Sequence, residues 1–256
     1  MNRIEELFKK KNKNVLSVYM TAGYPSLNDT AMIIEELEKS GADMIEIGIP
    51  FSDPLADGLI IQHSSEEALK NGISLKKIFE QLKDIRKKVN IPLLLMGYIN
   101  PVMNYGMENF CKTAHELGMD GCIIPDLPLA EYQSEYKTLF EKYNLCNIFL
   151  ITPQTSEARI RQIDSISKGF IYVVSSASTT GTNMGKSDEK EKFFKRVNEM
   201  KLKTPTLIGF GISNKESFQQ ACKYANGGII GSAFVKAVQN SKDIKQDIKQ
   251  FTSAII

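Results

Sequence analysis

The chain has 256 residues, 42% of them hydrophobic, and its 32 basic and 30 acidic residues leave a formal net charge of +2. This near-neutral balance argues against a protein that binds nucleic acid by neutralising phosphates. The length allows one large core, and we expect a single domain over residues 1–256, because closed α/β barrels commonly reach roughly 250 residues.

Residues 1–14, MNRIEELFKKKNKN, have the spacing of an amphipathic helix and contain no apolar run of signal-peptide length. The longest apolar stretch, near residues 91–99, is far shorter than the roughly 20 residues that a membrane span needs. We therefore expect an extra N-terminal helix and a cytoplasmic protein.

Eight short β-rich runs alternate with amphipathic helical runs along the chain. Strands joined by helices are expected to be parallel, because parallel pairs need crossover connections. Eight units favour a closed (β/α)8 barrel, a TIM barrel, over an open doubly wound sheet, whose G-x-G-x-x-G turn is missing after the first strand. Extra helices are expected after the second and eighth strands. The predicted strands are residues 15–21, 44–49, 92–96, 121–124, 147–151, 170–174, 206–210 and 228–230.

Four widely spaced cysteines and only two histidines indicate neither a disulfide framework nor a zinc site. Cys111 and His115 are four residues apart on a predicted helix, but two ligands do not make a metal site. We expect no metal in this chain.

Glu46 interrupts an apolar strand in which Ile45, Ile47 and Ile49 share the opposite face. Because those aliphatic side chains should pack against the surrounding helices, Glu46 is expected to face the barrel interior. Burial raises the pKa of a carboxyl group, which suits one that must both give and take a proton. The alternative is a structural carboxylate that is bonded to neighbouring backbone.

Asp53 and Asp57 lie in the loop FSDPLADG, which follows this strand. The pairs Asp-Pro and Asp-Gly are common in turns for backbone reasons alone, so either residue could be structural. Two carboxylates at one strand end could instead divide proton transfer from electrostatic stabilisation.

Two glycine clusters end the seventh and eighth predicted strands. GFGIS, at residues 209–213, opens a helix with Ser213 as the candidate N-cap, and Gly231-Ser232 opens a short extra helix. TIM barrels bind phosphate at these two places, through bare backbone N–H groups and a helix N-terminus. The alternative is that these glycines serve tight turns alone.

EIGIPFSDPLADG at residues 46–58, GYINPVMNYG at 97–106, DGCIIPDLP at 120–128 and both glycine clusters together resemble the tryptophan synthase alpha chain family. The resemblance runs in register from about residue 15 to residue 237. It implies a TIM-barrel lyase that cleaves indole-3-glycerol phosphate to indole and glyceraldehyde 3-phosphate in tryptophan biosynthesis. It also implies no cofactor in this chain and a beta chain partner, which carries pyridoxal phosphate and receives the indole within an alpha2-beta2 heterotetramer.

The resemblance also assigns residues. Glu46 is implied as the general acid/base, Asp57 as the second catalytic carboxylate, and Asp53 as part of the loop that touches the beta chain. Tyr172 and Phe210 are implied beside the catalytic glutamate and in the indole pocket, with barrel packing as the alternative. The implied lid and phosphate residues are Thr180, Gly181, Gly209, Gly211, Gly231 and Ser232.

The sequence departs from the family pattern at two places. Ser176 and Ser178 stand where many members have a large residue and then a glycine in the lid, and Leu59 stands where proline is usual. Two rival functions remain: another phosphate-binding barrel enzyme, which would have no reason to carry PFSDPLADG, and a catalytically idle regulatory subunit, which would have no reason to keep both Glu46 and Asp57.

Overall fold

The computed structural model describes residues 2–174, 186–209 and 211–256. Eight parallel strands form a closed barrel, in which each strand pairs with the next and β8 pairs with β1. This arrangement confirms the TIM barrel and excludes the open sheet. The strands are β1 (Val15–Thr21), β2 (Met44–Gly48), β3 (Leu93–Met96), β4 (Gly121–Ile123), β5 (Cys146–Ile151), β6 (Ile171–Val174), β7 (Thr206–Gly209) and β8 (Gly227–Ile230).

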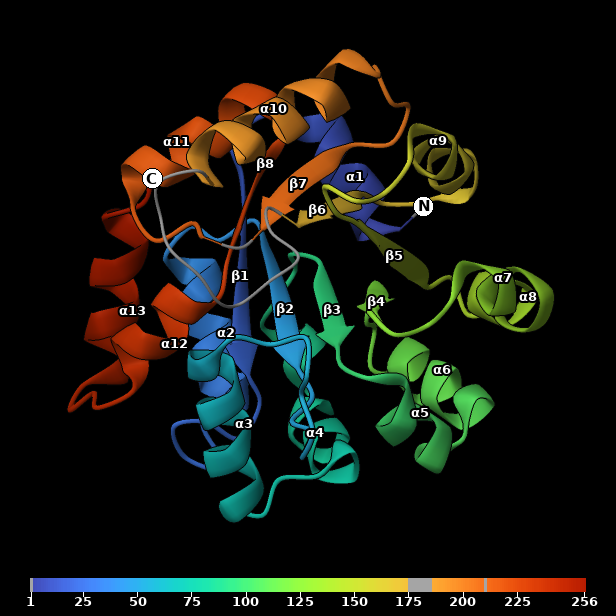
Figure 1. The fold of residues 1–256 in the computed structure, drawn as a ribbon. Coiled ribbons are helices and arrows are strands. Elements are labelled where there is room, and N and C mark those ends of the chain that lie inside the picture. Colours follow the sequence, from blue (N-terminus) through green and yellow to red (C-terminus); the bar gives the residue numbers. More distant parts are fainter. Residues whose placement is uncertain (1, 175–185, 210) are drawn as a thin grey trace.

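Helices surround the barrel (Figure 1). The predicted N-terminal helix is α1 (Arg3–Lys10), and the predicted extra helices are α3 (Leu59–Lys70) with α4 (Leu75–Leu82) after β2, and α12 (Ser232–Val238) with α13 (Ile244–Ser253) after β8. The other helical segments are α2 (Thr30–Lys39), η1 (Ile85–Lys87), α5 (Ile99–Tyr105), α6 (Met107–Glu116), α7 (Leu129–Glu131), η2 (Tyr132–Tyr136), α8 (Lys137–Lys142), α9 (Glu157–Ile166), α10 (Lys186–Glu199) and α11 (Lys215–Tyr224). Within the described ranges, no helix is long and apolar enough to span a membrane.

Local hydrogen bonds and backbone angles set three element boundaries, and the third of them corrects a prediction. After β2, α4 ends at Leu82, where the N–H of Lys83 bonds back only three residues, and η1 follows. A second helix, α6, follows α5 because Gly106 adopts a φ of +88° between them. Ser213 is not the N-cap of α11: Asn214 is, because its side chain accepts the N–H of Ser217.

The barrel interior is filled by side chains that alternate with those facing the helices. Met44 and Leu94 belong to the interior cluster, whereas Ile45 and Ile47 pack in the cluster between the strands and the helices. Glu46 therefore faces inward, as its strand pattern predicts.

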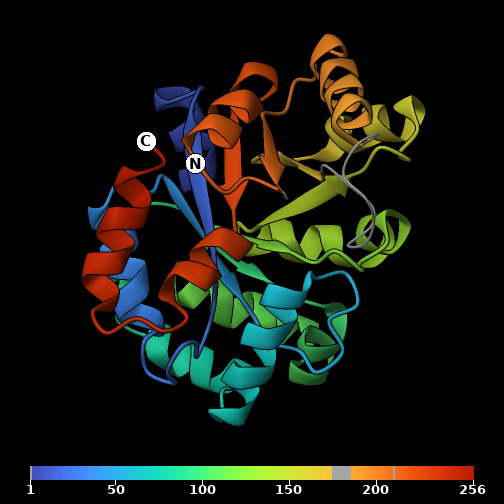
Figure 2. The ribbon, with the colours of Figure 1, turned by 60° about the vertical axis from the view of Figure 1, so that its left-hand side comes forward.

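The N-terminal end of the barrel is closed by α1. Its Ile4 and Phe8 join the interior cluster, and the ring of Phe8 lies 6.3 Å from that of Phe170. At the side of the barrel, α12 and α13 pack against each other and against α3 and α2, respectively (Figure 2). The loops at the opposite, carboxyl-terminal end of the strands are left to form a site.

Candidate active site

Glu46 is completely buried inside the barrel, with 0% of its surface exposed. The hydroxyl of Ser17 donates a hydrogen bond to its Oε1 at 2.9 Å, and no partner for Oε2 lies among the described residues. Burial raises the pKa of Glu46 to about 8, while the Ser17 bond opposes this rise. The carboxyl is thus mostly protonated at pH 7 and is able to act as an acid.

Asp57 lies in the loop between β2 and α3, and its backbone and side chain have separate tasks. Its N–H closes the turn by donating to the carbonyl of Pro54, while its Oδ2 accepts the hydroxyl of Tyr98 at 3.0 Å. The same hydroxyl accepts the N–H of Ala56 at 2.9 Å. Burial raises the pKa of Asp57 above its usual range, and the Tyr98 bond opposes the rise. The carboxylate is therefore free of the turn and available to a ligand.

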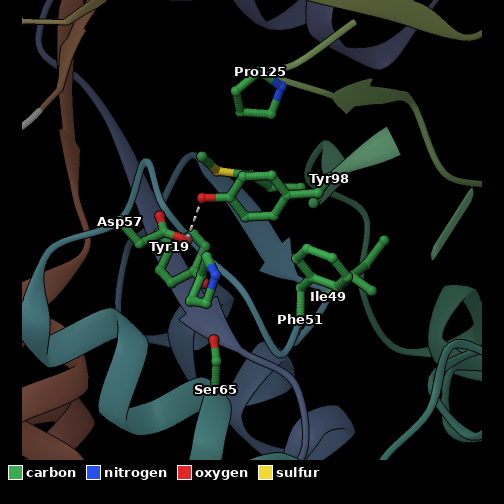
Figure 3. A pocket seen from close by; sticks show the side chains of 10 residues that line it. Tyr19, Ile49, Phe51, Asp57, Ser65, Tyr98 and Pro125 are labelled. Carbon is green, nitrogen blue, oxygen red and sulfur yellow. Dashed lines mark hydrogen bonds between the residues drawn. The ribbon is translucent and has the colours of Figure 1, made fainter. Parts of the chain in front are cut away.

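A pocket opens beside Asp57 (Figure 3). Figure 3 shows the hydroxyl of Tyr98 pointing at the carboxylate of Asp57, with Pro125 on the far side. The rings of Phe51 and Tyr98 lie 5.4 Å apart in the wall. The wall combines aromatic and aliphatic side chains with the hydroxyl groups of two tyrosines and a serine and with one carboxylate, which suits a flat aromatic ligand that carries a polar group. The lining residues are Tyr19, Ile49, Phe51, Pro54, Asp57, Ser65, Met96, Gly97, Tyr98 and Pro125.

Two tyrosines interact with Glu46, which does not itself line this pocket. Tyr19 lines the pocket and pairs with Glu46 in the register of β1 and β2. Burial raises the pKa of Tyr19 and of Tyr172 above their usual range, and the charges of Glu46 and Asp57 raise both further. Both phenols therefore stay neutral while the two carboxyl groups titrate.

The glycine clusters lie at the same end of the barrel as the carboxylates. A Cβ atom on Gly209 would come within 2.2 Å of the hydroxyl of Tyr172, so only glycine fits there. Gly211 has a φ of +81°, which also favours glycine. Gly231 lies against Tyr19 and precedes α12 without a side-chain cap, and the next residue, Ser232, is exposed. The first N–H groups of α12 therefore have no side-chain cap and are available to an anion at this end of the barrel.

The remaining predicted residues lie elsewhere. Asp53 is exposed on the loop between β2 and α3. Leu59 is the first residue of α3, a position where proline is favoured, and 81% of its surface is exposed. Thr180, Gly181 and Phe210, together with Ser176 and Ser178, lie outside the described residues. In the described part of the chain, no group of three or more His, Cys, Asp or Glu residues could hold a metal ion.

Sequence reasoning missed three residues of this site: Ser17, Tyr19 and Tyr98. Ser17 and Tyr19 occupy alternate positions of a strand otherwise rich in aliphatic residues, so a polar group on the inward face was a usable signal. Tyr98 follows β3 within the motif GYINPVMNYG, at the strand end where barrel sites form.

Comparison with known proteins gives a consistent assignment. The family model described as tryptophan synthase alpha chain matches residues 6–255. A tryptophan synthase alpha chain from Flavobacterium psychrophilum is 58% identical over 255 residues, covering 100% of both chains, and one from Bacteroides thetaiotaomicron is 51% identical with the same coverage.

Solved structures agree with this result. The tryptophan synthase alpha subunit of Legionella pneumophila superposes with a TM-score of 0.89 at 34% identity, covering 100% of this chain and 97% of that one. A chain of tryptophan synthase from M. tuberculosis superposes with a TM-score of 0.86 at 26% identity, covering 100% of both. The chain therefore belongs to the tryptophan synthase alpha chain family, the lyase subunits that cleave indole-3-glycerol phosphate to indole and glyceraldehyde 3-phosphate in tryptophan biosynthesis.

Proposed function

We propose that Glu46 and Asp57 divide the cleavage of indole-3-glycerol phosphate between them. Glu46 gives its proton to the ring carbon that carries the glycerol chain. The resulting carboxylate then takes the proton of the adjacent hydroxyl, the carbon–carbon bond breaks, and its electrons return to the ring. Indole and the aldehyde form, and Glu46 regains the proton it gave.

The observation that carries this assignment is the complete burial of Glu46 inside the barrel. Burial raises the pKa of Glu46 to about 8, so the free enzyme holds a proton to give at neutral pH. Asp57 has the complementary task. Protonation of the ring carbon leaves positive charge at the ring nitrogen, and an ionised carboxylate that accepts the N–H stabilises that charge.

The proposal assigns the phosphate of the substrate to the glycine-lined end of the barrel. Gly209, Gly211, Gly231 and Ser232 would present backbone N–H groups there, and the bare start of α12 supports this placement. Following the family resemblance, Thr180 and Gly181 are assigned to a lid that closes over the substrate, and Phe210 to the indole pocket. Tyr172 would pack beside Glu46.

We also propose a partner, the beta chain of tryptophan synthase, in a heterotetramer of two alpha and two beta chains. Leu55 and Leu59, in and just after the loop that carries Asp53, are each 81% exposed, which suits a surface that is covered in a complex. The alpha chain would use no cofactor, and pyridoxal phosphate would belong to the beta chain. All four cysteines are free, which is usual in a reducing compartment and supports a cytoplasmic location.

Replacing Glu46 tests the catalytic assignment. Glu46→Gln keeps the size of the side chain but has no proton to cycle, so we expect kcat to fall by roughly 10²–10⁴-fold. Indole release would be followed by fluorescence with and without a beta chain, against a background of tyrosine only, because the chain has no tryptophan. Glu66→Gln, on the exposed outer face of α3, is the matched control and should keep full activity. A wild-type chain that released no indole even with a competent beta chain would contradict the proposal.

The partner role of Asp53 has a separate test. Because Asp53 is exposed, Asp53→Ala should spare the basal activity of the isolated chain and abolish its stimulation by the beta chain. Indole formation would be measured as a beta chain is titrated in, with the exposed Asp84→Ala as control. Equal losses with and without the beta chain would reject the separation of partner binding from catalysis.

A further inference from the structure

Ser17 is the polar partner of the buried carboxyl group in this site. Ser17 and Glu46 each have 0% of their surface exposed, and the hydroxyl of Ser17 donates to Oε1 at 2.9 Å. We propose that Ser17 is a positioning residue, which holds one oxygen of Glu46 in the free enzyme and leaves Oε2 to transfer the proton. The inference rests on the proposed role of Glu46 as the acid/base.

The surroundings explain why a serine is needed here. Ser17 pairs with Met44 in the register of β1 and β2, and Glu46 pairs with Leu94 in that of β2 and β3. Both of these neighbours belong to the apolar interior cluster. An apolar residue at position 17 would leave both carboxyl oxygens without a donor among the described residues. The Ser17 hydroxyl donates its hydrogen bond to Glu46. In the described structure, the polar group of Ser17 therefore serves Glu46.

Removal of the Ser17 hydroxyl would change the pKa of Glu46 in one direction only. The titratable groups that interact with Glu46 are Tyr19 on β1 and Tyr172 on β6, and Asp57 interacts with both phenols from the loop after β2. The pKa of each phenol lies above its usual range, so neither phenol titrates together with Glu46. Burial raises the pKa of Glu46 and the Ser17 bond lowers it, because a donor stabilises the charged form. Loss of the hydroxyl would therefore raise the pKa of Glu46 further.

The pH dependence of kcat/KM for indole formation tests this, because it reports the ionisation of the free enzyme. The acid form of Glu46 is the active one, so activity falls as the pH rises through its pKa, near 8 in the wild type. In Ser17→Ala the alkaline limb should move upward by about one pH unit, the scale of one hydrogen bond to a charged group. The acidic limb, which belongs to Asp57, should not move.

Ser17→Cys separates the hydrogen bond from the filling of space. A thiol fills the space of the hydroxyl, being somewhat larger, but is a weak donor, so the alkaline limb of Ser17→Cys should lie between those of the wild type and Ser17→Ala. If Ser17 only filled space, Ser17→Cys would behave as the wild type. Thr252→Val, which removes a buried hydroxyl from α13 on the outer side of the barrel, is the control and should leave both limbs in place.

A second readout does not depend on turnover. The carboxyl carbon signal of Glu46, assigned in the NMR spectrum of the labelled chain by its loss in Glu46→Gln, should titrate at higher pH in Ser17→Ala than in the wild type. An unmoved titration, or a kcat/KM that drops by the same factor at every pH, would overturn the role of Ser17. Full activity in Glu46→Gln would instead overturn the proposed function itself, so the two failures are distinguishable.

Discussion

At the scale of single residues, two carboxyl groups of one site are prepared for opposite tasks by different neighbours. Glu46 is buried inside the barrel and accepts a hydrogen bond from the hydroxyl of Ser17, and burial raises its pKa to about 8. Asp57 is only partly enclosed, and the bond from Tyr98 restrains the rise of its pKa. These neighbours favour a proton on Glu46 and restrain the rise of the pKa of Asp57, and the proposed cleavage requires the first group as the acid and the second ionised.

Tyr98→Phe tests the second half of this pairing. Loss of the hydroxyl removes the bond that lowers the pKa of Asp57, so that pKa should rise. Because the ionised form of Asp57 is the active one, the acidic limb of kcat/KM should move upward by roughly half to one pH unit while the alkaline limb stays in place. The acidic limb is located by measuring kcat/KM for indole formation between pH 4 and pH 7.

Tyr105→Phe is the matched control for this experiment, since its hydroxyl contacts Thr113 in the neighbouring helix and not Asp57. An acidic limb that is identical in the wild type and Tyr98→Phe would show that Tyr98 does not tune Asp57.

At the scale of elements, alternation within a strand was the most informative signal in the sequence. It predicted the inward direction of Glu46, while the succession of strand and helix runs predicted the closed parallel barrel, because side-chain period and parallel crossovers are local rules. It could not predict the Ser17–Glu46 bond, whose partners are 29 residues apart, or the Tyr98–Asp57 bond, whose partners are 41 apart. Those contacts depend on how neighbouring strands and the loops after them are aligned with one another. The pattern within one strand carries no information about that alignment.

The same limit applies to two helix boundaries. The end of α4 at Leu82 and the start of α11 after Asn214 depend on hydrogen bonds that compete within one turn. At α11, the side chain of Asn214 rather than that of Ser213 reaches the N–H of Ser217. Ser and Asn are both strong N-caps, so residue type alone does not decide between neighbours.

At the scale of the whole molecule, the groups proposed for catalysis and a charged network that stabilises the fold lie at opposite ends of the barrel. The proposed catalytic groups lie at the carboxyl-terminal ends of the strands, whereas a charged network closes the opposite end around Asp120. One oxygen of Asp120 accepts Arg3 at 3.0 Å, and the other accepts Arg86 and the N–H of Leu93. Asp120 thus ties the N-terminal helix and η1 to β3, just before β4 begins.

Asp120→Asn tests this separation. The side chain of Asp120 is 3% exposed and that of Arg86 is 17% exposed, so the substitution leaves a largely buried guanidinium without its counter-charge. We expect the free energy of unfolding in denaturant to fall by about 3 kcal/mol. Asp84→Asn breaks an exposed ion pair with Lys87 and should change the free energy of unfolding by less than about 0.5 kcal/mol.

Because Asp120 lies at the end of the barrel away from the pocket, kcat for indole formation should be unchanged in Asp120→Asn well below its melting temperature. A loss of kcat without a loss of stability would mean that the two ends of the barrel are coupled.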